Sequence, residues 1–231
     1  MDAAITRFSR RFRLLHWAHA IPFLFLLISG LSLFIPPLKA LHVGGFRLVP
    51  LLHVIVGIAF ILSPLPLFVA VRSDAVATAD LRSLYRLRPE DRAWARYALG
   101  AVLGARVRLP LMGKFNLGQK ANALFTVVVT VGLMASGAVL AVNFFSKRVL
   151  SAAFVEHVFP VHDLLMLLAL PVLVAHVYLG SLNPSTRESL RGMTHGWVRR
   201  TWAREHHALW VKELEASEGD TVAGRSLDSF H

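Results

Sequence analysis

The 231-residue sequence contains no cysteine. This absence excludes disulfides, iron–sulfur ligation and covalent attachment of a c-type haem within the chain. Charge is missing from long stretches too: residues 14–35, 48–71 and 121–145 hold no Lys, Arg, Asp or Glu, and residues 157–182 hold only Asp163. A helix needs about 20 apolar residues to cross a bilayer. The sequence therefore predicts four transmembrane helices at these ranges.

Acidic residues are also few, 14 against 25 Lys and Arg, so that the formal net charge is +11. The basic residues gather in the N-terminal arm, in the connection 72–120 and in the segment after residue 182. The positive-inside rule places these parts in the cytoplasm and the connections 36–47 and 146–156 on the other side. We expect an all-α, integral membrane four-helix bundle with both termini cytoplasmic, in contact with lipid and with no nucleic-acid partner.

The connection between the second and third spans is too long for a simple loop. Residues 76–88 and 89–100 have the pattern of short amphipathic helices, which we expect at the cytoplasmic membrane interface; solvated surface helices are the alternative. Three aromatic residues would then lie at headgroup depth: Tyr85, Trp94 and Tyr97. We treat residues 1–205 as one transmembrane domain and residues 206–231 as a polar C-terminal tail. Within it, residues 211–231 are mixed in charge and are expected to be loosely ordered.

Four of the eleven histidines lie at membrane depth, where a polar side chain is costly and usually functional. His162 and His176 are both in the fourth span, 14 residues apart. At about 100° and 1.5 Å per residue they project from nearly the same face, about 21 Å apart along the axis. Each has a candidate partner at its own depth, His53 on the outer side and His16 on the inner side. Two such pairs predict two b-type haems with bis-histidine ligation, which favours electron transfer because no coordination position stays open.

Several residues in and near these spans have more than one possible role. An intramembrane histidine often serves only as a hydrogen-bonding residue between helices. His19 lies three residues from His16 and could take its role. Asp163 could contact a haem propionate or carry a proton, although we favour an interfacial residue near the helix start. Glycines in the spans could make room for a planar cofactor or for plain helix contacts: Gly30, Gly57, Gly132 and Gly137.

The segment GKFNLGQK, residues 113–120, introduces the third span from the cytoplasmic side. Asn116 and Gln119 have the spacing of an N-cap and an N3 residue, which predicts a capping box. The same amides could hydrogen-bond a quinone carbonyl, and Gly118 would allow its close approach. The depth of the segment matches that of His176, so both interpretations stand together.

The chain resembles the cytochrome b (gamma) subunit of membrane-bound, quinone-linked formate dehydrogenases over nearly its whole length. The matching motifs are RRFRLLHW with His16, LLH with His53, GKFNLGQK, the fourth span with His162 and His176, and then HVYLGSL, RGMTHGWV and WAREHHALW. The GKFNLGQK and C-terminal motifs are the more specific ones.

The resemblance implies four transmembrane helices and two haems b, with His53 and His162 as iron ligands of the outer haem and His16 and His176 as those of the inner haem. It implies a quinone site, for menaquinone or ubiquinone, at Asn116, Gly118 and Gln119. It also implies an iron–sulfur (beta) subunit and a molybdenum- or tungsten-containing catalytic (alpha) subunit as partners, in the bacterial inner membrane. Electrons would pass from the iron–sulfur subunit through the outer and inner haems to quinone.

We therefore expect a non-catalytic electron-transfer and quinone-reducing subunit of a formate dehydrogenase complex. One alternative is the cytochrome b subunit of another respiratory complex, of the hydrogenase or thiosulfate reductase type. The other is a haem-free membrane anchor or transporter, which the scarcity of intramembrane charges argues against.

Overall fold

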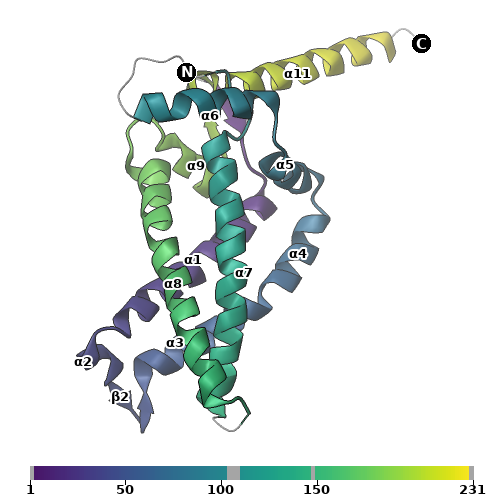
Figure 1. Cartoon of the computed structure of the whole chain (residues 1–231). Coiled ribbons are helices and arrows are strands. Elements are labelled where there is room, and N and C mark those ends of the chain that lie inside the picture. The colour runs from purple at the N-terminus through teal and green to yellow at the C-terminus, as the bar shows by residue number, and fades with distance from the viewer. Residues whose placement is uncertain (1–2, 103–109, 147–148, 229–231) are drawn as a thin grey trace.

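The computed structural model describes residues 3–102, 110–146 and 149–228. Within them most of the chain is helical, and the few strands are two or three residues long. Three helical segments have the length and apolar composition to cross a membrane (Figure 1): α1 (Arg10–Ser32), α7 (Leu117–Phe145), and α8 (Ala152–Val177) continued by the π-helix η1 (Tyr178–Leu182). The predicted mostly helical membrane protein is confirmed to this extent.

The second predicted span, 48–71, is not one continuous helix. It consists of α3 (Leu48–Leu62) and α4 (Pro64–Arg72), which meet at Ser63. Pro64 has no N–H to donate to the carbonyl of Phe60, and the Ser63 hydroxyl fills that place at 2.8 Å. The break therefore follows from the proline, and the predicted span 48–71 comprises two helices. The count of four membrane crossings stays a prediction.

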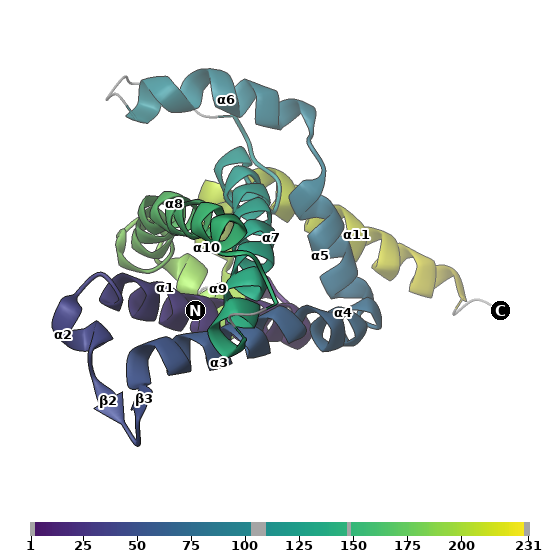
Figure 2. The ribbon, with the colours of Figure 1, turned by 60° about the horizontal axis from the view of Figure 1, so that its bottom comes forward.

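The long helices pack as two hairpins that face each other. α1 packs against α3, α7 packs against α8, and α3 joins the two hairpins through its contact with α7 (Figures 1 and 2). α8 runs unbroken over 26 residues although Pro160 and Pro171 lie inside it. Serine hydroxyls cap the first turns of α1 and α8 by accepting the N–H of Phe12 and Phe154.

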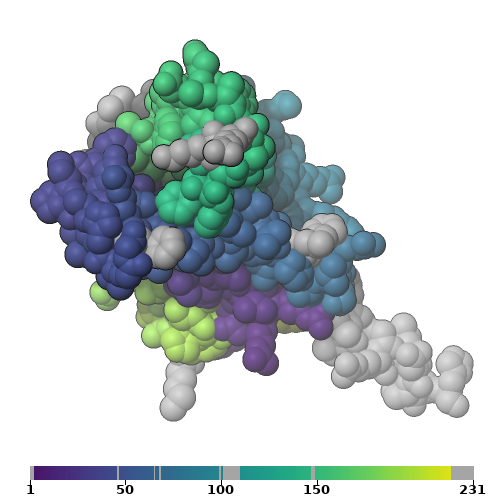
Figure 3. All heavy atoms as spheres, turned by 90° about the horizontal axis from the view of Figure 1, so that it is seen from below, coloured from purple at the N-terminus to yellow at the C-terminus, as the bar shows by residue number. Residues whose placement is uncertain are grey.

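One end of the bundle, here called the hairpin end, carries the short helix α2 (Pro36–Lys39) and the strands β2 (His42–Val43) and β3 (Phe46–Arg47). The strands pair antiparallel around Gly44 and Gly45, whose positive φ angles of 59° and 84° suit a tight two-residue turn. Figure 3 views this end directly and shows the dark blue segment beside the green ends of α7 and α8.

The opposite end, here called the terminus end, holds both termini. β1 (Ala4–Thr6) pairs antiparallel with β4 (Trp197–Arg199), and three further helices follow or flank β4: α9 (Glu188–Thr194), α10 (Arg200–His206) and α11 (Ala208–Asp228). Both termini thus lie at one end, as the charge pattern requires. That this end is cytoplasmic stays a prediction.

The expectation of a loosely ordered C-terminal tail is wrong for the part that forms a helix. Residues 208–228 form the helix α11. Trp210 and Val211 are buried at 5% and 2% exposure, in a cluster that includes Ile5 from β1 and Val198 from β4. These apolar side chains anchor the start of α11, which a composition average over the polar tail conceals.

The two amphipathic segments form α5 (Ala75–Tyr85) and α6 (Pro89–Val102) at the terminus end. Asp74 caps α5 by accepting the N–H of Ala77, and Pro89 opens α6. Figure 2 shows α6 outside the bundle, beyond the start of α7. Tyr85 and Tyr97 are about half exposed. The two helices are confirmed, and their position at a membrane interface stays a prediction.

Candidate functional site

The first histidine pair lies toward the hairpin end and joins α3 to α8. The ring centres of His53 and His162 are 6.4 Å apart, and their ring planes make an angle of 82°. Each imidazole also meets a serine through Nδ1, at 2.8 Å in both cases. Ser29 from α1 contacts His53, and Ser136 from α7 contacts His162. Side chains from four long helices therefore converge on this pair.

The second pair lies toward the terminus end and joins α1 to α8. The ring centres of His16 and His176 are 6.2 Å apart, with an angle of 52° between the planes. The side-chain amide nitrogen of Asn122, in the second turn of α7, lies 3.4 Å from Nδ1 of His176. Trp17, next to His16, donates its indole N–H to the carbonyl of Met193 in α9 at 3.0 Å. The wall around this pair thus includes the start of α7 and the segment after η1.

α8 contributes one histidine to each pair. Because it is continuous from Ala152 to Val177, the 14-residue spacing of His162 and His176 corresponds to about 21 Å along the helix axis. The structure brings together the two combinations expected from depth: His53 with His162, and His16 with His176. His19 instead packs its ring against Phe23 and Phe60, with ring centres 5.4 and 5.2 Å away.

The spacing within each pair can be tested against an iron held between two imidazoles. A metal–nitrogen bond of about 2 Å on each side, with about 1.1 Å from each nitrogen to its ring centre, gives about 6.2 Å between ring centres. The two pairs have 6.4 and 6.2 Å. The residues therefore fit a metal centre that needs one axial imidazole on each face.

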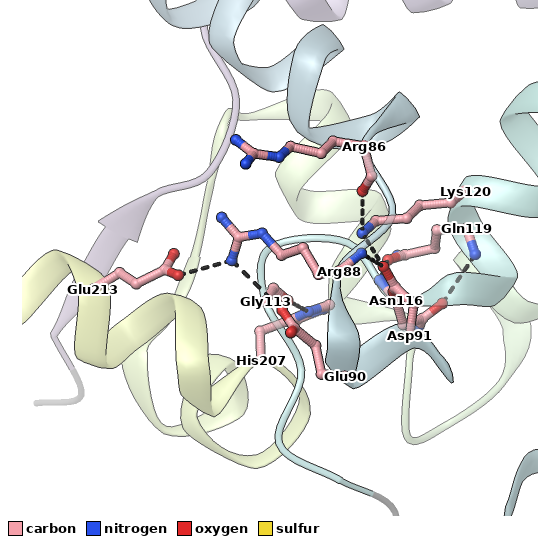
Figure 4. A network of polar contacts seen from close by, with 10 residues as sticks. All are labelled: Arg86, Arg88, Glu90, Asp91, Gly113, Asn116, Gln119, Lys120, His207 and Glu213. Atoms are coloured by element: carbon pink, nitrogen blue, oxygen red, sulfur yellow. Dashed lines mark hydrogen bonds and ion pairs between the residues drawn. The ribbon is translucent and has the colours of Figure 1, made fainter. Parts of the chain in front are cut away.

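Asn116 and Gln119 form the capping box predicted at the start of α7 (Figure 4). The Asn116 side-chain oxygen accepts the backbone N–H of Gln119 at 2.9 Å, and the Gln119 side-chain oxygen accepts that of Asn116 at 3.0 Å. Both amide oxygens are thereby used. The capping box leaves the side-chain NH₂ groups of both residues as hydrogen-bond donors for another partner.

Gly118 lies between these two amides and packs against Trp94 of α6. A Cβ atom at Gly118 would stand 3.4 Å from the Trp94 ring and 3.3 Å from the Asn116 side-chain oxygen. The absent side chain therefore lets the tryptophan approach α7. Trp94 thus lies next to the capping box, and its expected position at headgroup depth stays a prediction.

A buried ion pair fastens α6 to α7 beside the capping box (Figure 4). Lys120 donates to Asp91 at 2.6 Å and to the backbone carbonyl of Arg86 at 2.9 Å. Asp91 also accepts the backbone N–H of Arg88 at 2.8 Å. The two charged side chains are 1% and 6% exposed, so their partners replace most of the water that a charge would otherwise bind.

A second buried polar cluster holds the terminus end together. Arg7 donates to Nε2 of His207 at 3.0 Å. Nδ1 of His207 donates to the carbonyl of Gly113 at 2.8 Å (Figure 4). Burial lowers the pKa of Arg7 to about 9, and burial together with the Arg7 charge lowers the pKa of His207 to about 2. A neutral His207 therefore links the N-terminal arm to the segment that introduces α7.

Comparison with known proteins decides the family. The model of the family described as "Prokaryotic cytochrome b561" matches residues 7–196. The chain belongs to this family. The match includes all four histidines of the two pairs and the capping box of α7.

Curated relatives of this cytochrome b561 family member are formate dehydrogenase subunits. The nitrate-inducible cytochrome b556(Fdn) subunit of Escherichia coli K12 is 25% identical over 210 residues, which cover 89% of either chain. The cytochrome b556(fdo) subunit of that strain is 24% identical over 212 residues, 91% of this chain and 93% of the relative. The cytochrome b556 subunit of Haemophilus influenzae formate dehydrogenase is 23% identical over 214 residues, which cover 92% of this chain and 84% of the relative. The resemblance drawn from the sequence motifs is confirmed.

Membership of a cytochrome b family implies haem b, and the long apolar helices make this cytochrome b561 family member a multi-pass bacterial membrane protein.

The glycines of the apolar spans divide between room for a cofactor at the histidines and plain helix contacts. Gly30 and Gly137 face the imidazoles of His53 and His162, whereas Gly57 faces Leu26 and Gly132 faces Leu165, as in plain helix contacts.

Some residues around the sites of this cytochrome b561 family member were not predicted as site residues. Ser29 and Ser136 each precede a glycine inside a span, and this repeated Ser-Gly pair is a signal that the sequence does contain. Asn122 could be found as a polar residue about one helical turn, three residues, beyond Gln119. Asp91 and His207 had no local signal, because their burial depends on contacts with distant segments.

Proposed function

We propose that the chain is the membrane-anchor cytochrome b subunit of a formate dehydrogenase complex and that it transfers electrons from an iron–sulfur subunit to a quinone. The observation that carries the proposal is that two histidine pairs, both spaced for bis-imidazole ligation, each take one histidine from the continuous helix α8, at positions 14 residues apart. The names of the curated relatives supply formate as the substrate of the complex.

His53 and His162 would hold one haem b toward the hairpin end, and His16 and His176 would hold a second haem b toward the terminus end. When bound, the haems supply one-electron carriers at two depths of the membrane. The protein contributes the ligand spacing and the apolar walls. Ligation by two histidines would leave no open coordination position, which suits electron transfer rather than oxygen binding.

We place the quinone at the start of α7. The side-chain NH₂ groups of Asn116 and Gln119 would donate hydrogen bonds to its carbonyl oxygen, since their oxygens are used by the capping box. Support comes from Asn122, which lies one turn beyond Gln119 and approaches His176. The Gly118–Trp94 contact provides an aromatic wall on the α6 side. A quinone here would lie beside the second histidine pair.

The partners would approach from the hairpin end. The arginine-rich terminus end belongs in the cytoplasm by the positive-inside rule, which leaves the hairpin end on the periplasmic side of the inner membrane. An iron–sulfur subunit docked there would lie next to His53 and His162. Because this chain has no cysteine for iron–sulfur ligation, the clusters would belong to the iron–sulfur subunit. That subunit would in turn bind the molybdenum- or tungsten-containing catalytic subunit.

The decisive experiment combines a haem count with two matched histidine variants. The purified protein should contain two haems b per chain by pyridine haemochrome assay. His162→Ala should remove one haem and leave the other. His157→Ala, an exposed histidine five residues earlier on the same helix, should keep both.

Two results would contradict the ligand assignment: a haem-free parent protein, or a His162→Ala variant that retains both haems. The formate assignment is tested separately. Formate added to the intact complex should reduce the haems, and reduction by another donor but not by formate would transfer the proposal to a different respiratory complex.

A further inference from the structure

Two serines meet the histidines of the hairpin-end pair in the same way. Ser29 and Ser136 lie on α1 and α7, the first helix of each hairpin, and each approaches Nδ1 of a histidine on the second helix at 2.8 Å. A glycine follows each serine, and a Cβ atom built on either glycine would stand 3.4 Å from the imidazole Cε1. The two hairpins therefore repeat one contact, although the sequences around them differ.

We propose that Ser29 and Ser136 are positioning residues that set the tautomer, the ring orientation and the electron density of His53 and His162. The proposal rests on the haem ligation proposed above. It concerns this pair alone, since the histidine contact found at the other pair is with the Asn122 amide.

The direction of the two hydrogen bonds follows from the serine hydroxyls. A hydroxyl has one hydrogen, and Ser29 donates it to the carbonyl of Leu26 at 3.2 Å. Ser136 donates its hydrogen to the carbonyl of Gly132 at 2.8 Å. With the hydroxyl hydrogen on the backbone carbonyl, each serine oxygen accepts from the histidine and Nδ1 carries the imidazole proton; this is the arrangement that the proposal requires.

This tautomer leaves the lone pair on Nε2, which is the nitrogen available for iron. The opposite arrangement, with serine donating to Nδ1, would put the proton on Nε2 and prevent ligation. Both serines are only 8% exposed, so water offers little substitute for either hydroxyl. In the proposed arrangement the serine hydroxyls thus hold both ligands in this tautomer.

A serine oxygen that accepts a hydrogen bond from Nδ1–H also increases the electron density on Nε2, the ligating nitrogen. A more electron-rich imidazole stabilises ferric more than ferrous iron, so both serines lower the reduction potential of the haem at this pair. Removing one serine should raise that potential. A tenfold change in the ratio of ferric to ferrous haem at a fixed potential corresponds to about 59 mV for one electron.

The test is a redox titration of purified protein followed by the haem absorption bands. Ser29→Ala and Ser136→Ala should each change the ferric-to-ferrous ratio of one haem by up to about tenfold in the ferrous direction, and the double variant should change it further. The second haem should titrate as in the parent. Ser32→Ala is the matched control, because this partly buried serine of α1 likewise donates to a backbone carbonyl, that of Ile28, and contacts neither histidine pair in the hydrogen bonds found for it.

A spectroscopic signature separates positioning from general damage. The low-spin ferric electron paramagnetic resonance signal depends on the angle between the two imidazole planes, which is 82° at this pair. Its g values should change in the alanine variants and return toward the parent in Ser29→Thr, which restores a hydroxyl. If an alanine variant loses the haem at this pair and keeps the other, ligand positioning is supported as well.

The proposal is overturned if both alanine variants titrate like the Ser32→Ala control with unchanged g values. It is also overturned if both haems shift equally. A parent protein without haem would instead refute the proposed function, so the two failures are distinguishable.

Discussion

Lys120 and Asp91 form a buried ion pair whose disruption should release α6 from α7. At 2.6 Å, with an effective dielectric constant of about 20, the gross attraction between the charges is about 6 kcal/mol. Much of it is offset by the cost of removing both charges from water. Removing one charge is different, because the remaining charge stays buried without its partner. Lys120→Met should therefore cost about 3–5 kcal/mol.

The loss should appear locally in hydrogen–deuterium exchange. A cost of that size raises the exchange rate of α6 amides by about a hundredfold to a few thousandfold, provided that they exchange by local opening. The double variant Asp91→Asn with Lys120→Met removes both charges. It keeps an oxygen to accept the N–H of Arg88, so it should exchange more slowly than Lys120→Met alone.

The matched control is the exposed pair of Arg88 and Glu213, 2.8 Å apart with side chains 35% and 48% exposed. Glu213→Gln should change local stability by less than about 1 kcal/mol, because solvent screens an exposed pair. The reasoning is refuted if Lys120→Met leaves α6 exchange unchanged, or if the double variant exchanges faster than the single one.

Two further predictions concern the terminus end. Asn116→Asp and Gln119→Glu keep an oxygen for the capping box but lose the NH₂ donors. Each should therefore slow quinone reduction by about tenfold, while the free energy of unfolding changes by less than about 1 kcal/mol. Unchanged quinone kinetics would leave the pair with a capping role alone. His207 has a folded-state pKa of about 2, below its unfolded value of about 6.5, so the stability it contributes is complete above pH 6.5 and is lost as the pH falls below that value, by about 2 kcal/mol at pH 5. His207→Gln should therefore show a smaller drop in melting temperature between pH 7 and pH 5 than the parent, and equal drops would argue against this link.

Much of the bundle could be predicted because the relevant signals are local. The lack of charge in the apolar stretches identifies α1, α7 and α8, and the Asn116–Gln119 spacing identifies the capping box. Two details that the structure adds to these predictions have equally local causes. Proline interrupts the second span at Ser63, and the apolar Trp210 and Val211 lie in a segment whose average composition is polar.

The sequence by itself predicted matched depths for the four histidines, because helical rise and hydropathy depend on neighbouring residues. It also determined that His162 and His176 share one face of α8. Depth then limited which histidines could meet, and the tertiary structure brought those pairs together.

Only the tertiary structure decided which polar groups surround the histidines and hold the terminus end. The Ser29–His53 contact joins residues 24 apart, the Lys120–Asp91 pair residues 29 apart and the Arg7–His207 contact residues 200 apart. These contacts depend on how the helices pack, and no periodicity along the chain encodes them. The physical reason is that a buried polar group must replace its hydrogen bonds to water with hydrogen bonds to the groups that packing places beside it, wherever in the chain these lie.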